Sequence, residues 1–332
     1  MRYLVTGATG FIGSRLAARL AAEGHEVRAI VRAPHSPAAD VLRAAGVDVR
    51  PGDVRDRATL AAPMRDVDGV FHLAAARISA ERGADLVRTV NVDGTRYVLE
   101  AMRAYGVPRG VLTSALAVNG DTRGRLVDEF HCYDGPLAGV FERAKRDAYR
   151  LVAEPMMAEG LPLIVLLPGV VYGPDDRSAL RDAFRQYLVG ELPMLPRNTA
   201  YCWAHVDDVV DVHLRAMEQG HPGESYIVGG PAHTVVEAFE MAARITGVPA
   251  PALRVAPGVL RLAAAMMGVV EDEAPASPRW GRGGRTVASG VSQIGNDAKA
   301  RRELGFDPRP LAEGLRDTLA HEMRALGMRL PV

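Results

Sequence analysis

The amino-acid sequence predicts an α/β fold in which a doubly wound parallel sheet carries a smaller, mostly helical C-terminal lobe. Three observations support this prediction. Short β-rich runs alternate with amphipathic helical patterns, a glycine-rich turn follows the first run, and the alternation stops after Tyr172. Because consecutive parallel strands need a crossover connection, usually a helix, this alternation is typical of a Rossmann-like sheet with right-handed crossovers.

Six runs in the first half are expected to form largely buried strands, separated by helical patterns such as 14–24 and 92–106. The runs are RYLVTG at 2–7, EVRAIVR at 26–32, VDVRPGD at 47–53, GVFHLAA at 69–75, GVLTSALAV at 110–118 and LPLIVLLPGVV at 161–171. SYIVGG at 225–230 is expected to return to the same sheet. We therefore predict a dinucleotide-binding domain at 1–172, rejoined by 205–230, and a substrate-binding lobe formed by 173–204 and 231–332.

The composition excludes several classes of function. Forty basic and forty acidic residues cancel in a chain of 332, so no strong field favours nucleic acid or an anionic membrane as a partner. The apolar stretch 258–270 contains Arg261 and is shorter than the ~20 residues of a bilayer span. Two cysteines, Cys132 and Cys202, are too few for a disulfide framework. We expect a cytoplasmic protein with a small-molecule substrate.

The turn VTGATGFIG, residues 5–13, lies between the first strand and the first helix. Gly7, Gly10 and Gly13 lack a Cβ where the chain must turn tightly, approach a pyrophosphate and bring the helix close to the strand. The helix N-terminus also presents free N–H groups and partial positive charge to phosphates. This arrangement indicates a dinucleotide site rather than a merely tight turn.

The end of the second strand bears on cofactor choice. An NAD site favours a carboxylate there, which accepts a hydrogen bond from the ribose 2′-hydroxyl. Here Val31 is followed by Arg32, which suits a 2′-phosphate. We therefore predict NADP as cofactor, with NAD as the less favoured choice; the alternative is that Arg32 is a solvated charge.

Seven motifs in a fixed order carry a family resemblance. They are TGATGFIG at 6–13, GDVRD at 52–56, FHLAA at 71–75, NVDGT at 91–95, PGVVYGP at 168–174, HVDDVVDVH at 205–213 and KARRELGF at 299–306. Together they resemble the extended short-chain dehydrogenase/reductase superfamily, in its dihydroflavonol-reductase-like or NAD-dependent epimerase/dehydratase branch. The resemblance covers almost the whole chain.

The resemblance implies a set of cofactor-binding residues. They are Gly7, Thr9, Gly10, Phe11 and Ile12 in the turn, Arg32, Asp53 and Val54 on the adenosine side, and Leu73, Ala74, Ala75, Thr113, Lys145, Pro168 and Val171 on the nicotinamide side. Asp207 and Asp208 start a helix, where carboxylates commonly cap free N–H groups.

The catalytic positions depart from the family pattern. The family uses a Ser or Thr after the fifth strand and a Tyr-x-x-x-Lys pair, whose i, i+4 spacing places both side chains on one helix face. In this chain the Ser position is Ala115 and the Tyr position is Phe141, so that Lys145 alone remains. A phenyl ring cannot transfer a proton, and loss of a general acid typically costs ~10²–10⁴ in rate. The ordinary carbonyl-reductase mechanism is therefore in doubt.

Other side chains could replace the missing donors. His131, Cys132 and Tyr133 lie in the loop that, by the resemblance, passes the substrate, and we retain His131 and Tyr133 as catalytic candidates beside Lys145. Their ordinary role would be surface or packing. Cys202 and His205 lack a complete four-ligand spacing, so no metal site is expected.

Three functions remain open. The first is an NADP-binding enzyme with a modified proton relay that acts on a small carbonyl, hydroxylated or sugar-like metabolite. The second is an inactive nucleotide-binding sensor or scaffold, and the third is a non-redox dehydratase, isomerase or cyclase. The resemblance also implies a homodimer formed through two long helices near 84–105 and 137–160. Residues 271–291, rich in Gly, Pro and Arg, are expected to be a lid or a disordered segment.

Overall fold

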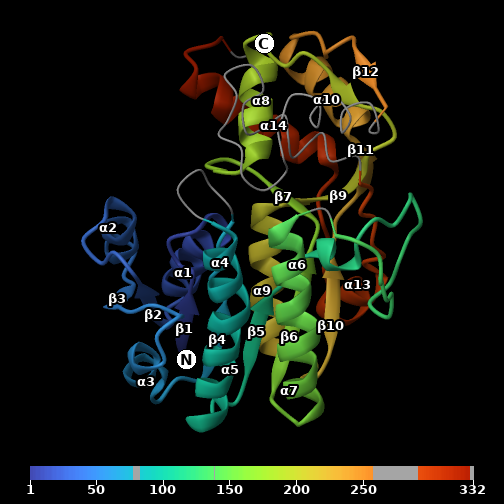
Figure 1. The fold of residues 1–332 in the computed structure, drawn as a ribbon. Coiled ribbons are helices and arrows are strands. Elements are labelled where there is room, and N and C mark those ends of the chain that lie inside the picture. Colours follow the sequence, from blue (N-terminus) through green and yellow to red (C-terminus); the bar gives the residue numbers. More distant parts are fainter. Residues whose placement is uncertain (78–82, 138, 257–290, 330–332) are drawn as a thin grey trace.

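The computed structural model describes residues 1–77, 83–137, 139–256 and 291–329. Its larger domain contains a seven-stranded sheet in the order β10-β6-β5-β4-β1-β2-β3, and every neighbouring pair is parallel (Figure 1). The strands are β1 (Arg2–Thr6), β2 (Glu26–Val31), β3 (Asp48–Pro51), β4 (Gly69–His72), β5 (Gly110–Thr113), β6 (Leu163–Pro168) and β10 (Ser225–Val228). This architecture confirms the predicted doubly wound α/β class.

Helices cover both faces of the sheet. One face packs against α1 (Phe11–Ala22), α2 (Pro37–Ala44), α9 (Val206–Gln219) and α13 (Ala298–Leu304); the other packs against α3 (Ala58–Met64), α4 (Ala84–Arg88), α5 (Gly94–Ala104), α6 (Val140–Ala148) and α7 (Glu154–Ala158). Strand alternation explains the two cores: Leu4 of β1 lies in the core of α5, whereas Val5 lies in the core of α1.

Two of the predicted runs change structure part of the way along. The run 110–118 is a strand only as far as Thr113, after which a 3₁₀ turn spans Leu116–Asn119. The run 161–171 divides into β6 and β7 (Val170–Tyr172), and β7 leaves the large sheet to pair with β9 (Ala200–His205). A Cβ on Gly169 would lie 2.3 Å from the carbonyl oxygen of Cys202, so the glycine permits this close crossing.

The smaller lobe lies beyond the carboxyl ends of the large sheet (Figure 1). It contains the sheet β11-β9-β7, with β11 at Ala232–Thr234, a two-stranded pair of β8 (Leu195–Pro196) and β12 (Arg254–Val255), and the helices α8 (Ala179–Leu188), α10 (Val235–Thr246) and α14 (Leu311–Ala325). Phe184, Tyr187 and Phe239 form its aromatic core, with ring centroids 5.3 and 5.4 Å apart. Arg181 and Arg185 pair with the buried Glu322.

Two features qualify the predicted organisation of the chain. The segment 298–306, assigned by sequence to the lobe, packs with its α13 against α9 and β10 of the larger domain. Residues 271–290, expected to be a lid or disordered, lie outside the described residues. Within the described part of the chain, no helix has the length and apolar character needed to cross a bilayer.

Candidate active site

The glycine turn lies where the strand order reverses, between β1 and β4, the usual place of a ligand site in such sheets. Gly7 has φ +74°, and a Cβ on it would lie 2.6 Å from the backbone nitrogen of Ala74. A Cβ on Gly13 would lie 2.3 Å from the carbonyl oxygen of Gly7. Both glycines are therefore required for the turn, the close strand contact and the packing of α1.

The N-terminus of α1 is free to bind an anion. Its cap residue is Gly10, whose lack of a side chain leaves the first N–H groups without a capping partner, and the first turn contains no acidic residue. Such a terminus combines free donors with the positive end of the helix dipole. These residues fit the pyrophosphate of a dinucleotide; Thr9, Phe11 and Ile12 are half-buried around the same turn.

A buried polar chain joins the strands beside this turn. Thr6 Oγ1 lies 2.6 Å from His72 Nδ1, and His72 Nε2 lies 3.0 Å from Thr95 Oγ1. Burial, reinforced by the charge of Lys145, lowers the pKa of His72 to about 3, so the ring is neutral near pH 7. These hydrogen bonds therefore connect β1, β4 and α5 without introducing a buried charge.

The residues after β4 continue from this polar chain. The Ala74 N–H donates to Thr6 Oγ1 at 3.3 Å. Leu73 and Ala74 are half-buried, and Ala75 is exposed. Ala74 faces the glycine turn across the 2.6 Å approach at Gly7, which brings together two groups of cofactor-binding residues predicted from separate motifs.

The residues predicted to lie beside the adenosine half of the cofactor differ in exposure and in partners. Arg32 is exposed just beyond β2 and forms no ion pair with any residue in the described ranges. Arg55 binds the Asp53 carboxylate at 2.6 Å and, with a smaller contribution from Arg32, lowers the pKa of Asp53. Val54 is buried against α5, where a Cβ on Gly94 would lie 2.8 Å from it. Arg32 is thus the available cation at this end of the site.

Lys145 is buried on α6, and its ammonium donates to the carbonyl oxygen of Thr113 at 2.8 Å. Burial, followed by the charge of Arg77, lowers the pKa of Lys145 to about 8. Thr113 Oγ1 lies 2.7 Å from His213 Nε2, and burial lowers the pKa of His213 to about 4. The end of β5 is therefore tied to α6 on one face of the sheet and to α9 on the other.

The position four residues before Lys145 contains no proton donor. Phe141 is half-buried, with the Lys145 ammonium 6.0 Å from its ring centroid and the Arg77 guanidinium 4.0 Å from it. Ala115 lies two residues after the end of β5 and is half-buried. The neighbouring Ser114 has a buried hydroxyl with no hydrogen-bond partner among the described residues.

The loop candidates have other partners. Tyr133 donates its hydroxyl to the carbonyl oxygen of Pro136 at 3.2 Å, and its ring covers Gly120, where a Cβ would lie 2.1 Å away. The carbonyl of His131 accepts from Arg150, while its buried Nε2 has no partner in the described ranges. The structure shows no contact that joins either residue to Lys145.

The remaining predicted positions lie in β6 and β7. Pro168 is the buried last residue of β6, and the half-buried Val171 follows in β7. Asp208 serves another purpose than helix capping, since Arg309 chelates its carboxylate at 2.7 and 2.9 Å. The described residues contain no group of three or more side chains suited to a metal ion.

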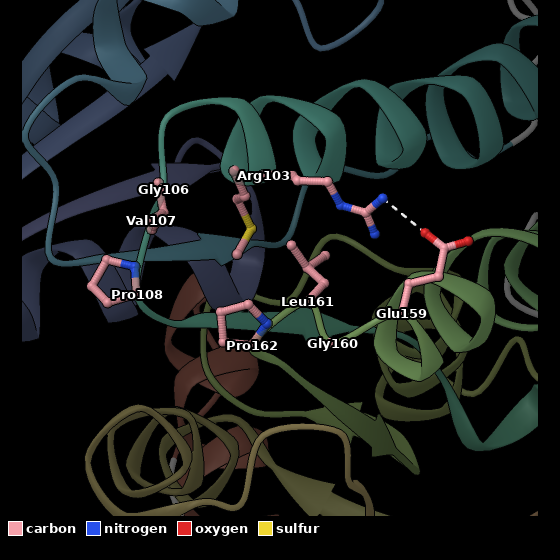
Figure 2. Close-up of a pocket in the computed structure, with 9 residues that line it drawn as sticks. Arg103, Gly106, Val107, Pro108, Glu159, Gly160, Leu161 and Pro162 are labelled. Atoms are coloured by element: carbon pink, nitrogen blue, oxygen red, sulfur yellow. Dashed lines mark hydrogen bonds and ion pairs between the residues drawn. The ribbon is translucent and has the colours of Figure 1, made fainter.

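A pocket of about 440 Å³ opens elsewhere, between α5 and α7 (Figure 2). Arg103 and Glu159 form a 2.8 Å ion pair across its rim (Figure 2). Its lining residues lie just before β5 and β6, at the amino edge of the sheet. It therefore lies away from the glycine turn and Lys145 and contains none of the predicted site residues.

Sequence reasoning did not identify Arg77 as a site residue. Arg77 lies two positions beyond Ala75, in no motif that carried the resemblance, and no spacing rule links it to Phe141, 64 positions later. The one available signal was the presence of a cation just after the cofactor-binding alanines.

Comparison with known proteins supports the family. The model of the NAD dependent epimerase/dehydratase family matches residues 3–229. Sterol demethylase protein B of Methylococcus capsulatus is 30% identical, over 96% of this chain and 98% of its own. In Stigmatella aurantiaca, 4-hydroxy-2-methyl-3-oxo-4-farnesyl-3,4-dihydroquinoline-1-oxide ketoreductase is 32% identical over 92% of each chain. The crystal structure of gox2253 superposes with a TM-score of 0.82 at 29% identity, covering 98% and 99% of the chains.

The family match extends from the glycine turn through Lys145 to the end of the large sheet. It confirms the motif-based prediction, including the Rossmann-like domain that binds the nicotinamide cofactor. The chain belongs to the NAD-dependent epimerase/dehydratase family of extended short-chain dehydrogenases/reductases.

Proposed function

We propose that this protein is an NADP(H)-dependent oxidoreductase that interconverts a carbonyl and a hydroxyl group on a small metabolite through a modified proton relay. The observation that carries the proposal is the retention of buried Lys145 on the Thr113 carbonyl beside a complete glycine turn. A scaffold that only binds nucleotide has no need of a buried amine, because burial of a charge is costly. When bound, the nicotinamide supplies the hydride chemistry.

The preference for NADP rests on Arg32. Its exposed guanidinium follows β2, whose Ile30 is paired with Thr6 at the glycine turn. The ribose of the adenosine half lies at this strand end in related folds, and a guanidinium there pairs with a 2′-phosphate. A charge-assisted hydrogen bond contributes roughly 1.5–3 kcal/mol, which corresponds to about tenfold or more in affinity.

The substrate class is supported by the relatives' names. The relative from Stigmatella aurantiaca is named as a ketoreductase of a farnesylated quinoline oxide, and that from Methylococcus capsulatus as a sterol demethylase protein. Phe141 and Ala115 give the site two apolar surfaces where the family usually has hydroxyl groups. We therefore favour a ketone or secondary alcohol on a largely apolar ring or chain over a sugar derivative.

Calorimetric titration of NADP⁺ and NAD⁺ tests the cofactor assignment. Wild type should bind NADP⁺ about tenfold or more tightly than NAD⁺, and Arg32→Ala should abolish that difference. Arg103→Ala is the matched control, because it removes an exposed arginine at the opposite edge of the sheet. Equal wild-type affinities for the two cofactors would refute the NADP preference.

Turnover distinguishes the enzyme from the sensor and the non-redox enzyme. Oxidation of NADPH in the presence of a panel of cyclic and long-chain ketones should be measurable in wild type and lost in Lys145→Met. A protein that binds NADP⁺ tightly but oxidises no NADPH with any ketone, and reduces no NADP⁺ with the matching alcohols, would favour the sensor.

A further inference from the structure

Arg77 lies over the phenyl ring that replaces the family's tyrosine. Its Cζ is 4.0 Å from the Phe141 ring centroid, within the range of a cation–π contact. A guanidinium in such a contact can lie flat on the ring, which leaves its N–H groups free to donate at the edge of the ring. The ring therefore supports a set of donors close to the position of the missing hydroxyl.

The backbone that carries Arg77 is held firmly. The preceding residue, Ala76, donates its N–H to Asn91 Oδ1 at 3.3 Å and accepts from Asn91 Nδ2 at 2.8 Å. Asn91 lies in the π-helical turn Thr89–Asp93 and also donates to the carbonyl of Val87 at 2.8 Å. π-helical turns inside α-helices are frequent at functional sites. This one fixes the point from which Arg77 extends.

The charges around Arg77 place it in the same site as Lys145. Its charge interacts with the carboxylates of Glu142 and Asp176 and lowers the pKa of Lys145. Asp176 is held by the N–H and hydroxyl of Ser178 at 2.8 and 2.6 Å. Arg77 has part of its surface exposed, although burial of its guanidinium lowers its pKa, and it forms no ion pair with a residue of the described ranges. Its donors are thus available to a substrate.

We propose that Arg77 is a catalytic residue that replaces the missing tyrosine hydroxyl, its guanidinium, which lies over the Phe141 ring, donating hydrogen bonds to the substrate oxygen. This inference rests on the proposed oxidoreductase function and names the residue of its modified relay. Arginine does not transfer the proton itself, since it stays charged in proteins. Its role is to stabilise negative charge on oxygen.

The reducing direction balances with groups of this chain and one hydride, which a bound reduced nicotinamide would supply as its C–H bond breaks and it is oxidised. The carbonyl carbon gains hydride, the electron pair of the broken C=O π bond moves to oxygen, and the resulting alkoxide is held by Arg77. One proton then passes from the Lys145 ammonium to the alkoxide to give the alcohol. Lys145 regains that proton from solvent, and the reverse sequence describes alcohol oxidation.

The main test compares Arg77→Ala, Arg77→Lys and wild type. Loss of a donor to a developing oxyanion costs ~10²–10³ in kcat, so Arg77→Ala should lose that factor while NADP⁺ affinity stays unchanged. Arg77→Lys should be intermediate, and added guanidinium chloride should restore part of the Arg77→Ala rate. Arg146→Ala, on the same helix as Lys145, is the control and should keep the wild-type rate. Melting temperatures of all variants, measured in parallel, distinguish a loss of rate from a loss of folding.

A second readout does not depend on turnover. Benzoate, a stable oxyanion, should bind the wild-type complex with NADP⁺ about tenfold or more tightly than the Arg77→Ala complex. Phe141→Leu, which removes the aromatic surface, should weaken benzoate binding to a lesser degree. Isothermal titration of each pre-formed complex measures both effects.

The outcomes separate this inference from the proposed function. If wild type reduces no ketone but binds benzoate through Arg77, the oxidoreductase function fails while Arg77 stands as the oxyanion donor. If wild type reduces ketones and Arg77→Ala keeps kcat and benzoate affinity, the inference is overturned and the function stands. Absence of any benzoate affinity in wild type would also overturn the inference.

Discussion

The site has a cofactor side, around the glycine turn, and a substrate side, around Ala115 and Phe141. The two sides differ in how many of their buried polar groups form hydrogen bonds within the protein. On the cofactor side, Thr6, His72 and Thr95 form a continuous hydrogen-bonded chain. On the substrate side, the buried hydroxyl of Ser114, next to Ala115, has no partner within the described residues. Buried polar groups are nearly always hydrogen-bonded, so the cofactor side is satisfied within the fold whereas the substrate side keeps an unpaired hydroxyl.

The two sides also differ in whether backbone geometry or side-chain chemistry determines their properties. The cofactor side depends on backbone geometry, because Gly7 and Gly13 allow approaches that no side chain permits. The substrate side depends on side chains, and two of them, Ala115 and Phe141, are apolar at the positions where we expect the family's hydroxyl groups. Side chains can change without altering the backbone, so a family member can keep its cofactor site while its chemistry changes.

The largest expected effect is a loss of cofactor binding when the glycine turn is changed. In Gly7→Ala, the new Cβ lies 2.6 Å from backbone atoms of Ala74 and Leu73, which cannot rotate away. We expect NADP⁺ affinity to fall by roughly two orders of magnitude or more, a loss of about 3 kcal/mol. Gly24→Ala is the control, because its φ of +85° gives similar backbone strain with nothing within 4 Å. Calorimetry on both variants checks this, and equal losses would contradict the close-approach argument.

The next prediction concerns hydroxyl groups restored to the substrate side. Phe141→Tyr with Ala115→Ser restores both family hydroxyls, and Lys145 should lower the pKa of the new phenol, since a nearby cation favours the charged form. Reduction of generic aldehydes that wild type turns over poorly should rise ~10²-fold. Phe130→Tyr, at a ring 85% exposed, is the control. A neutral or harmful effect of the double substitution would show that Phe141 does not occupy the proton donor's position.

A third prediction concerns how two buried histidines, His72 and His213, make stability depend on pH. Burial lowers the pKa of His72 to about 3 and of His213 to about 4, so both are neutral in the fold. The unfolded chain takes up protons below pH ~6.5, and stability present above that pH is lost as pH falls toward the folded pKa. Each histidine should add about 1.4 kcal/mol of destabilisation per pH unit.

Urea unfolding between pH 7 and pH 5 measures this slope. His213→Gln should lower stability at pH 7 but flatten the slope by the share of one histidine, while the exposed His35→Gln should keep the wild-type slope. An unchanged slope in His213→Gln would show that His213 is protonated in the fold.

The smallest expected effect concerns assembly, which lies outside both sides of the site. We propose that the protein forms a homodimer through the outer surface of α5 and the helices from α6 to α7. Leu151, in the π-helical turn between α6 and α7, is 63% exposed. Leu151→Arg should shift light-scattering mass toward the monomer, whereas Leu253→Arg, at a leucine 53% exposed elsewhere, should not. A monomeric wild type at micromolar concentration would refute the proposal.

The sequence by itself determined the features that depend on neighbouring residues. The strand–helix alternation, the position of Gly7, Gly10 and Gly13, and the i, i+4 pairing of Phe141 with Lys145 are local patterns with a fixed period or spacing. Strand ends were less predictable, because the chain stops pairing at Thr113 and changes sheets at Gly169 for reasons that lie in the packing around them.

Only the tertiary structure decided which distant residues meet. Asp208 and Arg309 are 101 positions apart, and the ion pair between them replaces the helix cap expected from local sequence. Arg77 and Phe141 likewise come together because β4 and the helix after β5 deliver them to one edge of the sheet. A long-range contact leaves no periodic trace in the sequence, since its partners are matched by the fold and not by their spacing along the chain.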